Sequence, residues 1–160
     1  MVRIIDATSQ EHIQIVSQMM REYSEWLGFD LSYQGFEEEL AGLPGKYAPP
    51  DGALVLAYID DEPVGMVAMR KIGPDVCEMK RLYLRPEGRG SGLGRRLVEE
   101  IMTRGRAAGF SKMRLDTVAG KMDKAISLYR EFGFEEIAAY YPSPVEHTIF
   151  LEADLRQLLT

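Results

Sequence analysis

The sequence predicts an α/β fold, with one mixed and mostly antiparallel sheet flanked by about four helices. Three observations carry this prediction. Apolar residues recur at helical spacing over residues 10–27, three strand-like runs separated by turns fill residues 53–84, and a glycine-rich turn joins the last of these runs to another amphipathic helix. The length of 160 residues fits a single domain, residues 1–160, with the element order β-α-α-β-β-β-α-β-α-β-β.

Residues 1–52 are predicted to form one strand and two helices. A short strand, Val2–Asp6, comes first, and Thr8 or Ser9 is placed to cap the helix over residues 10–27. Five apolar side chains recur along that helix at helical spacing: Ile13, Val16, Met20, Tyr23 and Leu27. A second, shorter helix, Phe36–Leu43, is stopped by the Pro-Gly pair that follows it.

The rest of the chain is predicted to form a meander, two further helices and three further strands. The meander consists of Ala53–Ile59, Val64–Ile72 and Val76–Leu84. The helices are Leu93–Ala108 and Met122–Phe132, the latter ended by Gly133, and the strands are Met113–Thr117, Phe134–Ala138 and His147–Leu155.

The composition excludes several classes of protein. Hydrophobic residues make up 46% of the chain and charged residues 28%, and no apolar run approaches the ~20 residues of a membrane span. The N-terminus has the pattern of a strand rather than of a signal peptide. The net charge of −6 argues against nucleic acid as a partner. Because Cys77 is the single cysteine, no internal disulfide is possible, and we expect a cytoplasmic protein.

The charges are unevenly distributed along the chain. Residues 79–114 hold ten Lys/Arg and three Asp/Glu, whereas residues 1–60 hold three Lys/Arg and ten Asp/Glu. The simpler interpretation is that both sets are solvated surface. The alternative is a basic half that holds a polyanionic cofactor and an acidic half near a cationic acceptor.

The most informative stretch is residues 88–97, Gly-Arg-Gly-Ser-Gly-Leu-Gly-Arg-Arg-Leu, between a predicted strand and a predicted helix. Such a turn gathers backbone N–H groups at the positive end of a helix dipole, which suits a phosphate or pyrophosphate. Three glycines let the backbone approach a ligand, and three arginines add cationic donors: Gly90, Gly92, Gly94, Arg89, Arg95 and Arg96. We therefore predict an anion-binding turn.

The spacing of the glycines narrows the identity of the anion. Neither G-x-G-x-x-G nor a P-loop fits, whereas R-x-x-G-x-G fits at Arg89, Gly92 and Gly94. This pattern resembles the acyl-CoA pyrophosphate loop of the GNAT superfamily of N-acetyltransferases. Cys77–Pro86 resembles the central strand of that family, and Ala125–Phe134 resembles its second signature, A-x-x-L-Y-x-x-x-G-F.

The resemblance implies the GNAT acyl-CoA N-acyltransferase fold, with acetyl-CoA as cosubstrate and no metal. It further implies that the central strand bulges and diverges from Met113–Thr117, which leaves backbone groups for the pantetheine arm to pair with. The backbone of the strand would also supply the oxyanion donor. The residues that it assigns to cofactor binding are Leu82, Tyr83, Leu84, Arg89, Gly90, Ser91, Gly92, Leu93, Gly94 and Arg95.

Glu78 is the candidate base. A lysine-type amine has a pKa near 10.4, so presenting it neutral at pH 7 costs about 4–5 kcal/mol, whereas an α-amino group costs only about 1 kcal/mol. Glu78 precedes Arg89 by eleven residues, an offset similar to that of the glutamate base in histone-modifying relatives. It would take the amine proton directly or through water. The alternative is that Glu78 pairs with Lys80 or Arg81, or reaches solvent.

Tyr129 is the candidate acid, because it occupies the tyrosine position of the second signature. A phenol with a pKa of about 10 can protonate a thiolate whose pKa is about 8.5. From its helical spacing alone, Tyr129 would more often be a core residue, and it is the resemblance that favours a catalytic role. One departure from the family pattern concerns Met122, which stands where many relatives carry an asparagine that contacts the cofactor arm.

Several other residues are candidates only for binding. Four aromatic residues surround the first helix, where relatives build the acceptor pocket: Tyr23, Trp26, Phe29 and Tyr33. Core packing is the simpler expectation for Trp26, and the loop Tyr140–Pro144 is a candidate specificity loop. His12 and His147 are isolated, so no metal site is predicted.

These observations together predict an enzyme that transfers the acetyl group of acetyl-CoA directly to a primary amine of a small molecule. One alternative is the same chemistry on a protein lysine or N-terminus. The other is a non-catalytic acyl-CoA-binding regulatory domain. The resemblance is compatible with a homodimer, and neither nucleic acid nor a membrane is expected as a partner.

Overall fold

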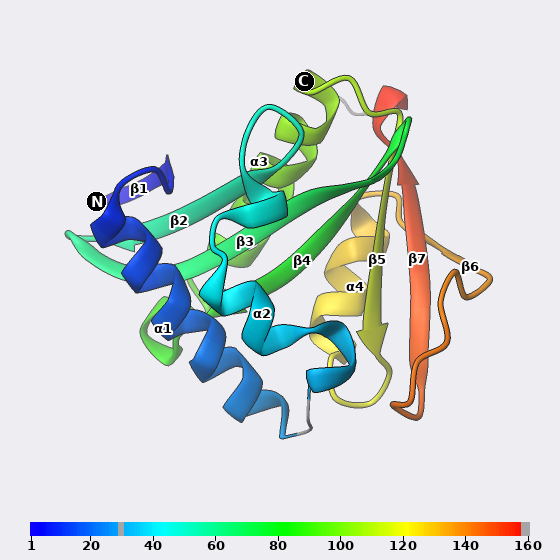
Figure 1. Ribbon diagram of the computed structural model, residues 1–160, viewed down its shortest axis with the longest axis horizontal. Helices are drawn as coiled ribbons and strands as arrows, with labels where there is room; N and C mark the ends of the chain where they lie inside the picture. Colours follow the sequence, from blue (N-terminus) through cyan, green and yellow to red (C-terminus); the bar gives the residue numbers. More distant parts are fainter. Residues whose placement is uncertain (29–30, 158–160) are drawn as a thin grey trace.

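The computed structural model describes residues 1–28 and 31–157 and shows one seven-stranded sheet between two layers of helices. The strand order is β1-β2-β3-β4-β5-β7-β6, and the helices α1 and α2 cover one face while α3 and α4 cover the other (Figure 1). The predicted fold class, a mixed and mostly antiparallel sheet flanked by helices, is therefore confirmed.

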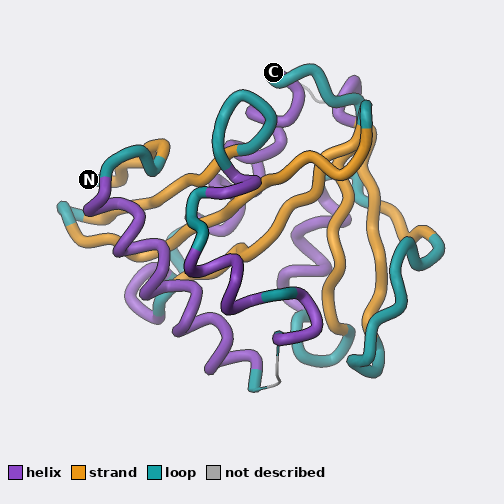
Figure 2. Tube along the Cα trace, in the orientation of Figure 1, coloured by secondary structure: helices purple, strands orange, loops and turns teal. Residues whose placement is uncertain are grey.

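The element order also agrees with the prediction. The strands are β1 (Val2–Asp6), β2 (Ala53–Ile59), β3 (Glu62–Gly73), β4 (Val76–Leu84), β5 (Lys112–Val118), β6 (Glu135–Ile137) and β7 (Thr148–Asp154). The α-helices are α1 (Gln10–Leu27), α2 (Phe36–Ala41), α3 (Leu93–Ala107) and α4 (Asp123–Glu131). Long loops join α2 to β2 and β6 to β7 (Figure 2).

The ends of helices and strands differ from the predicted boundaries by at most two residues. Of the two candidate caps of α1, Ser9 is the one used, since its hydroxyl accepts from the backbone N–H of His12. Helix α2 ends at Ala41, because Gly42 already caps it two residues before Pro44. A short 3₁₀ turn, Gly45–Tyr47, lies between α2 and β2.

Strands β4 and β5 are the parallel pair of the sheet, and their pairing is short. It covers Val76–Glu78 of β4 against Lys112–Arg114 of β5, and beyond Glu78 the two strands separate. On its other side β4 pairs with β3, with a register shift opposite Met66–Ala68. Arg81 has a φ of 63° at this irregularity, which marks a bulge in β4. The expected bulge and divergence are therefore present.

The two faces of the sheet carry separate apolar cores. On the α3 face, Leu97, Val98 and Ile101 have no exposed surface, and on the α1 face Val16 and Met19 have none. Because both faces are packed, β4 is held rigidly where it leaves β5. The open edge of β4 beyond Glu78 thus has a fixed shape.

None of the helices within residues 1–28 and 31–157 combines the length and apolar character that a membrane span requires. Those same residues contain no group of three or more His, Cys, Asp or Glu side chains placed to bind a metal ion.

Candidate active site

A groove of about 650 Å³ runs along the open edge of β4 to the start of α3. Six of the residues predicted to bind the cofactor line it: Leu82, Tyr83, Leu84, Arg89, Gly90 and Gly94. The opposite wall comes from residues 120–125 and Leu128 of α4 and its preceding turn. The groove therefore joins the two sequence signatures, which lie far apart in the chain.

The glycine-rich turn presents the N-terminus of α3 to this groove. Gly90 and Gly92 have φ values of 77° and 80°, a backbone conformation that residues with a Cβ rarely adopt. Gly92 is the N-cap, and Arg96 makes the first helical hydrogen bond, to Gly92 O at 3.2 Å. The backbone N–H groups of residues 93–95 have no intrahelical acceptor, so they are suited to an anion.

Other predicted cofactor residues contribute to the turn rather than to the groove wall. The Ser91 hydroxyl donates to Gly88 O at 2.6 Å, and Leu93 is buried in the core. The Arg95 guanidinium pairs with Glu131 at 3.0 Å. Their side chains shape the turn, and any contact of residues 93–95 with a ligand falls to the backbone.

Trp26 lies in the wall of the groove, so the expectation that it packs in the core is wrong. It is 39% exposed and lines the groove with residues of β4 and of the turn before α4. Two cations flank its ring, with Arg89 Cζ 5.8 Å and Lys121 Nζ 4.9 Å from the centroid. Two of the other three aromatic candidates of this segment, Phe29 and the side chain of Tyr33, lie outside the described residues. The third, Tyr23, has its ring edge-on to that of Tyr83, at 6.1 Å between centroids.

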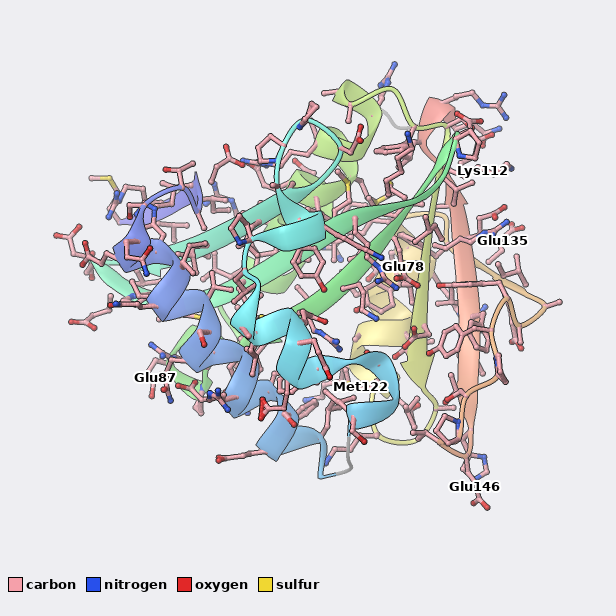
Figure 3. All side chains as sticks on the ribbon, in the orientation of Figure 1. Glu78, Glu87, Lys112, Met122, Glu135 and Glu146 are labelled. Carbon is pink, nitrogen blue, oxygen red and sulfur yellow. The ribbon has the colours of Figure 1, made fainter. Side chains whose placement is uncertain are left out.

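A narrow pocket of about 40 Å³ occupies the gap between β4 and β5. Its wall includes Tyr129 from α4, Lys80 and Leu82 from β4, and Asp116 from β5. Met122 and Leu82 line both this pocket and the groove, so the two spaces adjoin. Figure 3 shows Met122 below Glu78, toward the end where the strands are apart.

Tyr129 is both a core residue and a pocket residue. It is 5% exposed, and its ring meets that of Phe134 edge-on at 5.8 Å between centroids. Burial raises the pKa of the Tyr129 phenol well above its ordinary value of 10.0. The hydroxyl therefore stays protonated at neutral pH, the state that a proton donor needs.

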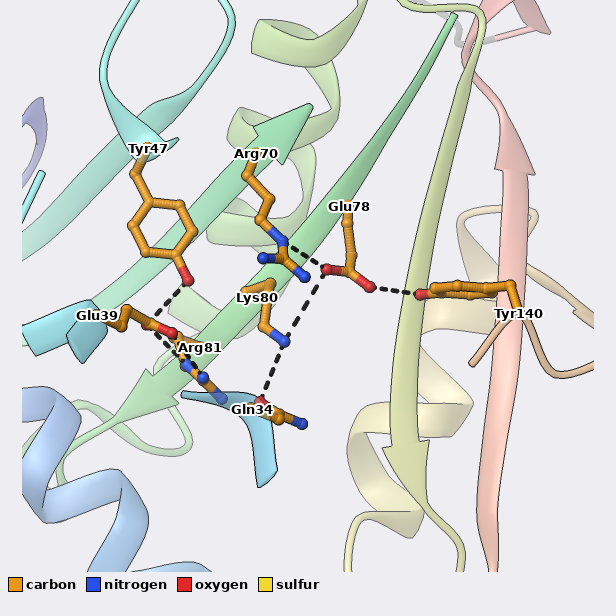
Figure 4. A network of polar contacts seen from close by, with 8 residues as sticks. All are labelled: Gln34, Glu39, Tyr47, Arg70, Glu78, Lys80, Arg81 and Tyr140. Carbon is orange, nitrogen blue, oxygen red and sulfur yellow. Dashed lines mark hydrogen bonds and ion pairs between the residues drawn. The ribbon is translucent and has the colours of Figure 1, made fainter. Parts of the chain in front are cut away.

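Glu78 lies just outside the wall of this pocket, and both its oxygens are engaged. It is 2% exposed; Oε1 accepts from Arg70 Nε at 2.9 Å and Oε2 accepts from the Tyr140 hydroxyl at 2.6 Å (Figure 4). Of the ion pairs considered from the sequence, the one with Lys80 is present, at 3.9 Å, whereas Arg81 pairs elsewhere.

Two of the Glu78 partners were missed from the sequence. Arg70 stands opposite Glu78 in the β3–β4 register, so a correct hairpin alignment would have found it. Tyr140 comes from the loop before β7 and had no local signal for this contact. The loop Tyr140–Pro144 thus touches the site through a hydroxyl, and burial together with the charge of Glu78 raises the pKa of Tyr140 far above its ordinary value.

Ion pairs between the acidic and basic segments explain the charge asymmetry of the chain. Three carboxylates of the first segment bind three arginines of the second: Glu39 with Arg81, Glu22 with Arg85 and Asp6 with Arg104. Their distances are 2.8, 2.9 and 2.9 Å. These carboxylates are therefore occupied within the fold, which does not favour an acidic half reserved for a cationic acceptor.

Comparison with known proteins agrees with this geometry. The family model for the acetyltransferase (GNAT) family matches residues 14–134. An uncharacterized N-acetyltransferase of Schizosaccharomyces pombe is 38% identical over 139 residues, covering 86% of this chain and 85% of its own length.

Solved structures share the fold. A GNAT acetyltransferase of Staphylococcus aureus superposes with a TM-score of 0.79 at 18% identity, covering 97% of this chain and 99% of its own. The PaiA N-acetyltransferase of Thermoplasma acidophilum, solved with coenzyme A, has a TM-score of 0.73 at 19% identity, with 96% and 99% covered. With its glycine turn at the start of α3 and its gap between β4 and β5, the chain belongs to the GNAT family of acetyl-CoA-dependent N-acetyltransferases.

Proposed function

We propose that this enzyme transfers the acetyl group directly from acetyl-CoA to a primary amine of a small molecule. The observation that carries the proposal is the pocket between β4 and β5, which adjoins the groove and holds the Tyr129 side chain in its wall. A thioester whose pantetheine arm lies along the open edge of β4 would reach this pocket. The narrowness of the pocket favours a small acceptor over a protein segment.

The reaction needs one proton removed and one supplied. The amine nitrogen attacks the thioester carbon, the tetrahedral oxyanion forms, and the C–S bond then breaks as the carbonyl returns. Tyr129 gives its proton to the departing thiolate, and backbone N–H groups around Leu82–Leu84 stabilise the oxyanion. Because Glu78 lies outside the pocket wall with both oxygens engaged, we propose that it takes the amine proton through a water molecule.

The test is release of free CoA thiol from acetyl-CoA across amines, amino acids and peptides. Release with small amines is expected, and release with peptides alone would instead favour a protein acetyltransferase. Saturable acetyl-CoA binding without release for any acceptor would favour a regulatory binding domain.

Tyr129→Phe tests the assigned acid. It should lower kcat of order a hundredfold, because the thiolate then leaves unprotonated, with little change in stability. Tyr58→Phe is the matched control, since Tyr58 lies on β2 away from the pocket. A near-wild-type kcat for Tyr129→Phe would remove Tyr129 from the mechanism.

Three broader features belong to the same proposal. Residues 1–160 act as one domain, since all seven strands join one sheet. A cytoplasmic location suits a chain whose single cysteine forms no internal disulfide. Homodimerisation stays a prediction.

A further inference from the structure

Lys80 is a buried lysine whose close contact is an uncharged group. Its side chain is 8% exposed and lines the pocket between β4 and β5. The ammonium donates to Gln34 Oε1 at 3.1 Å, and Glu78 Oε1 lies 3.9 Å away. That carboxylate oxygen already accepts the Arg70 hydrogen bond. Since an ammonium has three donors, Lys80 retains donors for a ligand.

The cations around Lys80 are each matched by a closer carboxylate. Arg81 binds both oxygens of Glu39, at 2.8 and 3.1 Å. Arg70 binds Glu78 at 2.9 Å. Lys80 differs from these arginines, because its one salt bridge among the described residues joins it to Glu78 at the longer distance of 3.9 Å. Burial accordingly lowers the pKa of Lys80 below its ordinary value of 10.5.

Two polar groups on β5 complete the pocket. Asp116 lines it, and within residues 1–28 and 31–157 its carboxylate makes no hydrogen bond or salt bridge. The hydroxyl of Thr117 is buried there without a hydrogen-bond partner in the same part of the chain. A buried polar group without a partner costs free energy unless a ligand satisfies it. The pocket therefore offers a cation on one wall and an anion on the other.

We propose that the acceptor carries an anionic group besides its amine, in the simplest case the carboxylate of an amino acid, and that Lys80 binds that group. Asp116 then attracts the ammonium end of the same molecule. The inference deepens the proposed function and rests on it. The pocket has about 40 Å³, roughly the space of three water molecules at 10–15 Å³ each, which fits the head of a short zwitterion.

This arrangement would select against neutral analogues. An amine without the anionic group leaves the buried Lys80 ammonium with only the Gln34 hydrogen bond and the Glu78 oxygen at 3.9 Å. Loss of a hydrogen bond to a charged group typically costs about tenfold to a hundredfold in binding. The enzyme would then discriminate against a neutral amine mainly because that amine offers Lys80 no anionic partner, and less because of the shape of the pocket.

The experiment compares kcat/KM for three matched sets of acceptors: amino acids, their carboxamides, and the amines that remain when the carboxyl group is removed. The wild-type enzyme should prefer the amino acids by roughly a hundredfold. Lys80→Met should abolish that preference, mainly through KM of the acceptor, and leave KM of acetyl-CoA unchanged. Lys80→Arg should restore part of it. The control is Lys71→Met, because Lys71 is an exposed lysine on the neighbouring strand β3.

The outcomes separate this inference from the proposed function. Equal use of neutral amines and amino acids by the wild-type enzyme would overturn the inference while the acetyltransferase function stands. An equal loss for all three sets in Lys80→Met would also overturn it, since that result indicates a purely structural lysine. Failure of every amine would overturn the proposed function and this inference with it. The wild-type comparison needs no variant, so it decides even if Lys80→Met does not fold.

Discussion

Lys80 and Arg81 are adjacent on β4, yet their surroundings differ. Arg81 is 3% exposed at its side chain and makes two hydrogen bonds to the Glu39 carboxylate. Lys80 is 8% exposed and makes one hydrogen bond, to the neutral Gln34 amide. Both partners come from the segment between α1 and the end of α2, as Figure 4 shows.

The bulge explains how two neighbours reach the same side of the sheet. Side chains of consecutive strand residues point to opposite faces, but the φ of 63° at Arg81 breaks that alternation. Arg81 then ties α2 to the sheet, whereas Lys80 faces the gap between β4 and β5. The difference teaches that a buried charge with a close carboxylate partner holds the fold, whereas a buried charge with only a distant one, beside a pocket, retains donors that a ligand could use.

The largest expected effect is on stability. Arg81→Met should lower the free energy of unfolding by about 3–5 kcal/mol, because it leaves the Glu39 carboxylate buried without its partner. Lys80→Met should change it by less than about 1 kcal/mol, since methionine replaces a poorly matched buried charge. Urea unfolding followed by circular dichroism measures both. Equal losses would contradict the comparison. Adding Glu39→Gln to Arg81→Met should recover part of the loss.

A smaller effect is expected on turnover when the hydrogen bond between Tyr140 and Glu78 is removed. Tyr140→Phe removes the donor to Glu78 but keeps the ring, which packs against Phe150 at 5.0 Å between centroids. Because this hydrogen bond helps to orient the proposed base, kcat should fall about tenfold, within the range for a bond to a charged group. KM for acetyl-CoA should stay unchanged, whereas the melting temperature should fall, because the buried Glu78 oxygen loses its hydrogen-bond donor. An unaltered kcat would show that Tyr140 has no positioning role.

Acid should weaken the ion pair between Arg81 and Glu39, because Glu39 becomes protonated. Burial opposes ionisation of Glu39, but hydrogen bonding and the charge of Arg81 outweigh it and hold the pKa of Glu39 below its ordinary 4.5. The contribution of the Glu39–Arg81 ion pair to the free energy of unfolding is therefore fully present above pH 4.5. It is lost as the pH falls through the lower pKa that Glu39 has in the folded state. The difference in urea midpoint between wild type and Glu39→Gln should shrink below that pH. A constant difference from pH 7 to pH 3 would refute this linkage.

The smallest expected effect is the reactivity of the Cys77 thiol, which lies in the part of β4 that pairs with β5. Its side chain is fully buried, and burial raises the pKa of the thiol to about 12. A disulfide reagent at pH 8 should therefore modify well under one thiol per native chain, and one thiol after denaturation. Rapid reaction of the native protein would contradict this expectation, since it would show that the paired half of β4 opens readily to solvent. The inert thiol also keeps the background of the CoA-release assay low.

Several features were predictable from the sequence because their causes are local. The spacing of apolar residues predicted α1 and α3. The glycines of the predicted turn before α3 include Gly90 and Gly92, which adopt positive φ values there. The placement of Tyr129 followed from the second signature. By contrast, the prediction that Trp26 packs in the core was wrong. An aromatic side chain at the end of a helix carries no local signal that tells a core position from a groove wall.

The sequence by itself determined the order of elements, the glycine-rich turn at the start of α3 and the membership of an acetyltransferase family, since each depends on short stretches of neighbouring residues. The tertiary structure decided which charges are matched. Glu39 lies 42 residues from Arg81, Gln34 lies 46 from Lys80, and Glu78 lies 62 from Tyr140. The physical reason is that electrostatic pairing depends on distance in space, and only the packed sheet brings these groups within hydrogen-bonding range.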